Sequence, residues 1–314
     1  MALAAVAAAA EAAVAVAAVS IAPPGSMPVD RFGLGWRPEL APGILSHLDQ
    51  IDALEIIAED HFEASRTALR SLRRLAAQLP VVWHGVSLGL ASMSPVAEAR
   101  LDRIARLLDA TGAEGWSEHL AFVRAGGIEI GHLAAPPRSP ESLDGACANL
   151  TRARRITGSM PQVENIATLI EPPASPLGEP EWVSGIVEGV GAAPLLLDLH
   201  NLYANAVNAG IEPFAFLRRF PLNRVRSVHL AGGRWIHGPN GTARLLDDHL
   251  HAVPPIVFAL LTELGRLAPQ PLTVIVERDG AYPPIAALLA ELATARRALA
   301  AGRRLAATAA QAAA

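Results

Sequence analysis

The sequence predicts an α/β protein built as a single (β/α)8 TIM barrel. The chain has 314 residues, of which 51% are hydrophobic, so it can bury a barrel-sized core. Short apolar runs alternate eight times with stretches of helical period, as in repeated βα units. Runs such as LLLD and LTVIVE are apolar on both faces, as expected where helices cover one face and the barrel core fills the other.

The eight predicted strands follow one another along the whole central part of the chain. They are residues 32–36, 53–58, 81–88, 114–120, 162–166, 194–199, 225–230 and 272–277. Helical periodicity between them predicts helices over residues 64–78, 96–111, 140–157 and 254–267. A doubly wound open sheet is the alternative, but no glycine-rich phosphate loop follows an early strand, which favours the closed barrel.

The two ends of the chain differ in composition from this central part. Residues 1–28 are predicted to form an Ala-rich disordered or loosely helical extension, residues 29–300 the barrel, and residues 301–314 an Ala-rich tail. The first 22 residues lack the positive start of a secretory signal, contain Glu11, and are too weakly apolar for a membrane span. We therefore expect a cytoplasmic protein with no membrane partner.

Charge and cysteine content narrow the classes of function. A formal charge of −4 and a pI near 6.2 provide no basic surface for nucleic acid, so no nucleic-acid partner is expected. The single cysteine, Cys147, excludes an internal disulfide and every multi-cysteine metal site. Any metal ion must therefore be held by nitrogen and oxygen.

Side chains that can bind metal follow nearly every predicted strand. They are His84, Glu118, His119, Glu164, Asn165, Asp198, His200, His229, Asp247, His249 and Glu277. Taken singly, a histidine here is usually a core or surface residue, and a carboxylate is usually a helix cap. Taken together, they would gather at the carboxyl ends of the strands, where barrel active sites are built and where burying uncompensated charge is costly.

Spacing and number indicate more than one ion. The donors in Asp198-Leu199-His200 and in Asp247-Asp248-His249 stand two residues apart, so in an extended segment both would project to one side. The set exceeds what one ion accepts, so two or three ions are expected, with Glu164 or Glu118 as possible bridges. Imidazole and carboxylate ligands suit iron, zinc or manganese, and ligand type does not separate these metals.

A series of motifs between Gly33 and Asp279 carries a family resemblance. In order they are LGWRPEL, HGVSLGLAS, SEHLAF, ENIATL, LLLDLHNLYANAVN, VHLAGG and VERD. The series resembles the multinuclear non-heme iron-dependent oxidative enzymes, a family of xylose-isomerase-like TIM barrels long catalogued as a domain of unknown function.

The resemblance implies two or three iron ions that use molecular oxygen to modify a ribosomally made precursor peptide, typically at a cysteine. It also implies a partner protein that recognises the peptide leader. The implied metal ligands are His84, Glu118, Glu164, Asp198, His200, His229, Asp247, His249 and Glu277, and the implied catalytic residues are Asn165, Asp198 and His200.

The chain departs from the family pattern at three places. Relatives usually have Glu-Asn where this chain has Glu59-Asp60-His61, so His61 could be a further ligand. Many relatives have asparagine at the position of His200. Leu250 replaces an acid between His249 and His251. The roles of His61, His119 and His251 therefore stay open.

Other classes of function remain alternatives. The same pattern resembles the trinuclear zinc site of barrel endonucleases, in which metal-bound hydroxide attacks a phosphodiester. Sugar isomerases of related architecture usually have a lysine near the site, and this chain has no lysine. A metal-binding or peptide-binding subunit without activity is a further alternative, against which the intact ligand positions argue.

Overall fold

The computed structural model describes residues 29–125, 127–238 and 241–313, and in it eight parallel strands close into a barrel. The order around the barrel is β1-β12-β9-β8-β7-β4-β3-β2. The strands are β1 (Arg31–Gly35), β2 (Ala53–Ile57), β3 (Val81–Gly85), β4 (Gly115–His119), β7 (Gln162–Glu164), β8 (Leu195–Asp198), β9 (Val225–Leu230) and β12 (Thr273–Val276). Each coincides with a predicted strand, and the TIM barrel is confirmed. The predicted extension over residues 1–28 lies outside the described residues.

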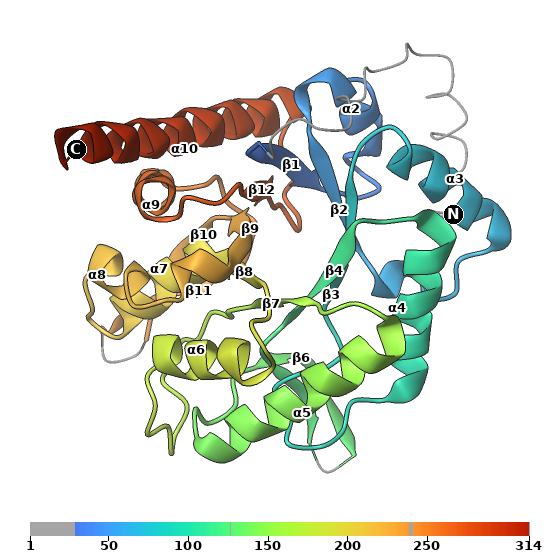
Figure 1. Cartoon of the computed structure of the whole chain (residues 1–314), viewed down its shortest axis with the longest axis horizontal. Coiled ribbons are helices and arrows are strands. Elements are labelled where there is room, and N and C mark those ends of the chain that lie inside the picture. The colour runs from blue at the N-terminus through green and yellow to red at the C-terminus, as the bar shows by residue number, and fades with distance from the viewer. Residues whose placement is uncertain (1–28, 126, 239–240, 314) are drawn as a thin grey trace.

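Helices pack around the outside of this barrel (Figure 1). They are α2 (Ala41–Leu45), α3 (Arg66–Ala76), α4 (Glu98–Thr111), α5 (Pro140–Thr157), α6 (Glu179–Gly189), α7 (Leu199–Asn208), α8 (Pro213–Leu217), α9 (Pro255–Leu267) and α10 (Ile285–Ala313). The four predicted helices are confirmed as α3, α4, α5 and α9. In the described part of the chain, no helix combines the length and the apolar character needed to span a membrane.

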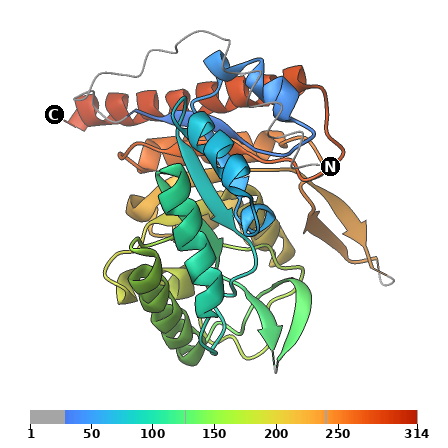
Figure 2. The same cartoon turned by 90° about the vertical axis from the view of Figure 1, so that its right-hand side faces the viewer.

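Two β-hairpins, which the sequence did not predict, follow strands β4 and β9. One consists of β5 (Phe122–Ala125) and β6 (Ile128–Ala134), the other of β10 (Gly233–His237) and β11 (Ala243–Asp247). Figure 2 shows both hairpins projecting on the same side of the barrel. Asp247 was expected in a loop, but it is the last residue of β11.

Helix α7 begins immediately after β8, with no loop between them. The Asp198 side chain accepts a hydrogen bond from the Asn201 amide at 2.7 Å and so caps the helix. His200 therefore lies in the first helical turn. The prediction that Asp198 and His200 share an extended segment is wrong, because the cap starts the helix at Leu199.

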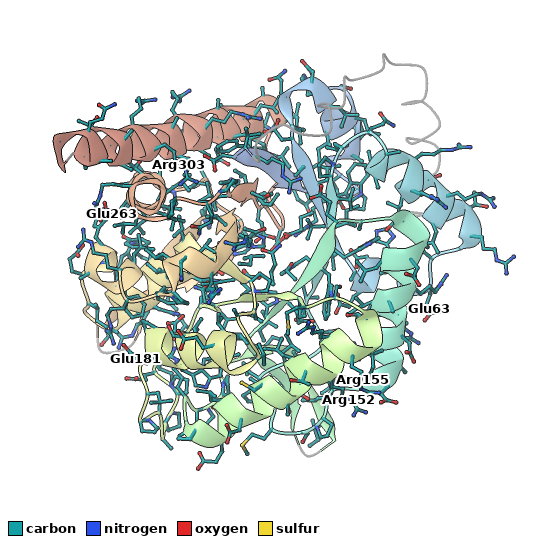
Figure 3. All side chains as sticks on the ribbon, in the orientation of Figure 1. Glu63, Arg152, Arg155, Glu181, Glu263 and Arg303 are labelled. Atoms are coloured by element: carbon teal, nitrogen blue, oxygen red, sulfur yellow. The ribbon has the colours of Figure 1, made fainter. Side chains whose placement is uncertain are left out.

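The long helix α10 crosses α9 at very short range. A Cβ atom on Gly302 would lie 2.0 Å from the Thr262 carbonyl oxygen, so only glycine permits this approach. Arg303, labelled in Figure 3, donates hydrogen bonds to Asp30 at 2.8 Å and to the Gln270 carbonyl at 2.6 Å. Residues 301–313, the Ala-rich tail, thus continue α10, and its first residues are fixed to the barrel.

Candidate metal centre

The candidate ligands converge at one end of the barrel because parallel strands bring their carboxyl ends together. His84 and His119 come from β3 and β4, Glu164 from β7, Asp198 from β8 and His229 from β9. Glu277 follows β12 directly, and His249 lies two residues beyond β11. Their donor atoms form overlapping groups in which all atoms lie within 4.8 Å of one another.

The first group consists of His84, His119 and Glu164. The Glu164 carboxylate lies 3.6 Å from His84 Nε2 and 3.3 Å from His119 Nε2. The other ring nitrogen of His84 lies 2.8 Å from the Ser117 hydroxyl. That contact fixes the ring so that Nε2 faces Glu164.

The second group, in the middle of the cluster, is formed by Glu164, Asp198 and His229. His229 Nδ1 lies 3.2 Å from Glu164 Oε1, and all three side chains are at most 1% exposed. Glu164 belongs to the first group as well. It is therefore placed to bridge two ions.

The third group consists of Asp198, His249 and Glu277. His249 Nε2 lies 3.8 Å from Asp198 Oδ2, and its Nδ1 lies 3.5 Å from Glu277 Oε2. The His249 backbone has φ +52°, in the left-handed region that non-glycine residues rarely adopt. Strain of this kind is found where a side chain must be aimed at a site.

Asp247 and His200 form a pair beside the third group. His200 Nδ1 lies 2.5 Å from Asp247 Oδ1, while Asp247 Oδ2 lies 3.0 Å from His249 Nε2. His200 Nε2 is buried and has no hydrogen-bond partner among the described residues. In this arrangement Asp247 stays within reach of the cluster, and His200 orients Asp247 rather than entering a group.

Two predicted site residues use their polar atoms elsewhere. The Glu118 carboxylate accepts hydrogen bonds from the Leu88 and His119 backbone amides at 3.0 and 2.9 Å. The Asn165 side chain exchanges two hydrogen bonds with the Asp198 backbone, at 2.9 and 3.1 Å. Both residues therefore hold backbone at the rim in place and belong to none of the groups.

The sequence did not assign roles to His61, His119 and His251, and it did not single out Glu55. Glu55 lies within β2, is 3% exposed, and forms a group with His229 and Glu277. An acid inside a strand that is otherwise apolar was the signal that could have revealed it. His119 is a group member, whereas His61 packs edge-on against Trp83 and the exposed His251 contacts Asp248.

The acids and imidazoles of the cluster compensate one another's charge. Burial disfavours protonated His119, but Glu164 and Glu118 outweigh it and raise the pKa of His119 to about 9. Burial and then Asp247 raise the pKa of Asp198 well above its ordinary value. Burial also favours protonated Glu164, yet His119 and His229 hold its pKa below the usual range. Such mutual shifts are typical of a functional site.

Several buried donor atoms of the cluster lack a partner in hydrogen-bond geometry among the described residues. They are His119 Nδ1, Glu164 Oε2, Asp198 Oδ2, His200 Nε2, His229 Nδ1 and both ring nitrogens of His249. Buried polar atoms are normally satisfied, because leaving them unpaired is costly. Cations placed between these nitrogen and oxygen atoms would satisfy them, so the side chains present fit a multinuclear metal centre.

Comparison with known families identifies the family of this chain. Residues 31–300 match the model of a family described as RiPP precursor modification enzyme MbnB/TglH/ChrH. The chain belongs to this family. By its description, this family modifies RiPP precursors, which are ribosomally made peptides.

Two curated relatives are named as UPF0276 proteins. A UPF0276 protein of Streptomyces avermitilis is 37% identical over 278 residues, which are 85% of this chain and 54% of that protein. The chain thus spans about half the length of that relative. A UPF0276 protein of Caulobacter vibrioides is 32% identical over 282 residues, which are 88% of this chain and 97% of that protein.

Solved structures support the fold. An L-ribulose 3-epimerase superposes with a TM-score of 0.61 at 15% identity, over 90% of this chain and 98% of that one. A xylose isomerase-like TIM barrel protein from Mycobacterium smegmatis, in complex with magnesium, gives 0.54 at 13% identity, over 88% and 98%. At such identities the likeness shows the fold, and the xylose-isomerase-like TIM barrel is confirmed.

Proposed function

We propose that this chain is a multinuclear non-heme iron enzyme that uses molecular oxygen to oxidise a cysteine of a ribosomally made precursor peptide. The observation that carries the proposal is the chain of three donor groups linked by Glu164 and Asp198. Family membership supports the peptide substrate. The resemblance of the motifs supports iron, oxygen and cysteine.

The ligands of the proposed centre come from all three groups. They are His84, His119, Glu164, Asp198, His229, His249 and Glu277, with Asp247 adjacent. Two or three iron ions bound there would supply one-electron redox chemistry and positions at which a thiolate and oxygen can be activated. Zinc and manganese are the alternative metals for the same donors.

The protein's own contribution is to fix these donors and keep water away from them. Asp198 is held at both ends, because its backbone pairs with Asn165 and its carboxylate caps α7. Asp247 is held by His200. Ligands fixed in this way cost little reorganisation when the oxidation state of the metal changes.

The surface around the centre suits an extended peptide. Of nine large apolar side chains exposed in the described part of the chain, seven lie on segments that follow the carboxyl ends of barrel strands. They are Met93, Ile128, Ile130, Leu169, Ile170, Trp235 and Leu250. Exposed apolar residues gathered around a site favour protein or peptide recognition. A partner protein that recognises the peptide leader is part of the proposal, on the motif resemblance alone.

The proposal is tested by turnover. Protein purified without oxygen is loaded with ferrous iron and mixed with the cysteine-bearing peptide encoded beside its gene, with and without oxygen. We expect an oxygen-dependent mass change confined to the cysteine-bearing fragment. A mass change that needs no oxygen, or one that persists in a Cys→Ser peptide, contradicts the proposal. Full zinc occupancy with cleavage of abasic DNA would favour the endonuclease alternative.

A further inference from the structure

Glu55 is a buried carboxylate in the barrel interior that faces a single imidazole. It lies in the middle of β2, where Gly35 of β1 and Val82 of β3 are its register partners. Both of its carboxylate oxygens lie close to His229 Nε2, at 2.9 and 3.0 Å. A buried charge of this kind is tolerated only when it is paired.

The two nitrogens of His229 have different surroundings. Among the described residues, Nε2 contacts the Glu55 carboxylate, whereas Nδ1 lies 3.2 Å from Glu164 Oε1 and 3.0 Å from Glu277 Oε2. An imidazole that binds a metal through one nitrogen carries its proton on the other and donates it to an acceptor. Nδ1 faces the shared carboxylates, so it is the nitrogen directed at the metal centre.

Glu55, His229 and Glu277 lie close enough to suggest a cation site of their own. Because Nε2 is the nitrogen in contact with Glu55, an ion bound between these two side chains would take the Nε2 lone pair, and His229 would then have its proton on Nδ1. Nδ1 would no longer be available to the group of Glu164 and Asp198, which would lose its only imidazole. The hydrogen-bonded arrangement uses both nitrogens and keeps the central group complete.

We propose that Glu55 is a positioning residue that accepts a hydrogen bond from the protonated Nε2 of His229 and thereby holds Nδ1 toward the central cation position. The inference rests on the proposed function only in requiring that the cluster binds cations. It follows that Glu55 binds no ion itself, and that the cations are held by the other three donor groups.

Two substitutions separate the positioning role from a ligand role. Glu55→Met keeps the length of the side chain but replaces both carboxylate oxygens by a thioether sulfur, which is only a weak acceptor. Glu55→Gln removes the charge and keeps one carbonyl oxygen that can accept a hydrogen bond from Nε2. Glu59→Gln is the matched control. Glu59 follows the same strand, but its carboxylate accepts hydrogen bonds from the Val86 and Ser87 amides and not from His229.

Zinc titration measures the metal affinity of each variant. NMR of 15N-labelled histidine in the diamagnetic zinc-loaded chain shows which nitrogen of His229 carries the proton. We expect Glu55→Met to lower the affinity for one of the bound zinc ions by about 10- to 100-fold. Glu55→Gln should lower this affinity less, and Glu59→Gln should leave it unchanged. In the wild type, the resonances of His229, assigned with His229→Gln, should show a protonated Nε2. That signal should be absent from Glu55→Met.

Three results would overturn the inference: a protonated Nδ1 in wild-type His229, unchanged zinc affinity in Glu55→Met, or equal losses in Glu59→Gln and Glu55→Met. A wild-type chain that binds no divalent ion would overturn both this inference and the proposed function. Normal zinc binding with the expected His229 signal, but no oxygen-dependent turnover with iron, would overturn only the proposed function.

Discussion

Glu118 and Glu164 lie at the ends of neighbouring strands, both are 1% exposed and both contact His119, yet their other partners differ. The Glu118 carboxylate accepts hydrogen bonds from two backbone amides. The Glu164 carboxylate contacts the imidazoles of His84, His119 and His229. The sequence predicted both as ligands and possible bridges, since residue type and strand position are the same. Their roles differ because the loop after β3 brings the Leu88 amide to Glu118.

Substitution of these two acids should affect metal binding differently. Glu164→Gln should release at least one ion, because the carboxylate belongs to two donor groups. Glu118→Gln should keep the full metal content and instead lower stability by about 1 kcal/mol, because charge-assisted bonds to two amides become weaker. Metal analysis and urea unfolding of both variants provide the measurement. Equal metal loss in the two variants would contradict this assignment.

Glu179 gives the stability of the protein a predictable pH dependence. It lies buried at the start of α6, 2.8 Å from Asn205 Nδ2 and 3.5 Å from Arg138. Burial, only partly opposed by Arg138 and Asn205, raises its pKa from 4.5 to about 7. The folded chain therefore keeps this proton to higher pH than the unfolded chain, so this contribution to stability is lost as pH rises from about 4.5 to about 7.

The variant Glu179→Gln should remove this contribution, because its amide does not titrate. The loss of stability between pH 5 and pH 8 should be smaller than in the wild type, by at most about 3 kcal/mol. Urea unfolding of both proteins at the two pH values is the measurement. An identical pH dependence in the two proteins would show that Glu179 titrates normally.

At the scale of elements, the sequence predicted the barrel strands and the helices with strong periodicity, and it missed both hairpins. The barrel strands are buried and apolar, so their signal is clear. By contrast, β6 and β10 are largely exposed, and the segment after β9 contains the polar run HGPNG. Pairing within a short solvated hairpin depends on the turn and on tertiary contacts, which leave little trace in hydrophobic pattern.

The crossing of α9 and α10 is the element contact most sensitive to a single substitution. Gly302→Leu would place a side chain where even a Cβ atom meets backbone at 2.0 Å. We expect a loss of stability of about 1–3 kcal/mol from overpacking, visible as a lower Tm. Ala307→Leu, at an exposed position of the same helix, is the control and should change little. A Tm that is equal for the two variants would contradict the close crossing.

For the whole molecule, convergence at the carboxyl ends of the strands explains why the candidate site could be predicted at all. Once eight parallel strands close, residues as distant in sequence as His84 and Glu277 must share one rim. What could not be predicted is orientation: Asn165 turns to the Asp198 backbone, and His200 turns to Asp247. These choices depend on local hydrogen bonds that exist only in the folded chain.

The exposed apolar residues around the barrel mouth, which include Ile128 and Ile130, should matter for peptide binding but not for metal binding. Ile128 is 73% exposed and Ile130 is 36% exposed, both on β6 near the mouth of the barrel. The double variant Ile128→Asp, Ile130→Asp should bind the precursor peptide at least about tenfold more weakly, because apolar contacts are replaced by charge. Leu305→Asp, at an exposed position of α10, is the control. Fluorescence anisotropy with labelled peptide measures the affinity of both variants. Equal affinities in the double variant and in Leu305→Asp would exclude the β5–β6 hairpin from the binding surface.

The central claim is that acids and imidazoles from separate strands together hold several cations. Metal analysis of the protein, purified without oxygen and without added metal, tests this claim most directly. We predict two or three metal ions per chain, predominantly iron, and loss of at least one ion in the Glu164→Gln variant. A folded wild-type chain with no bound metal, or with one ion that Glu164→Gln does not affect, would contradict it.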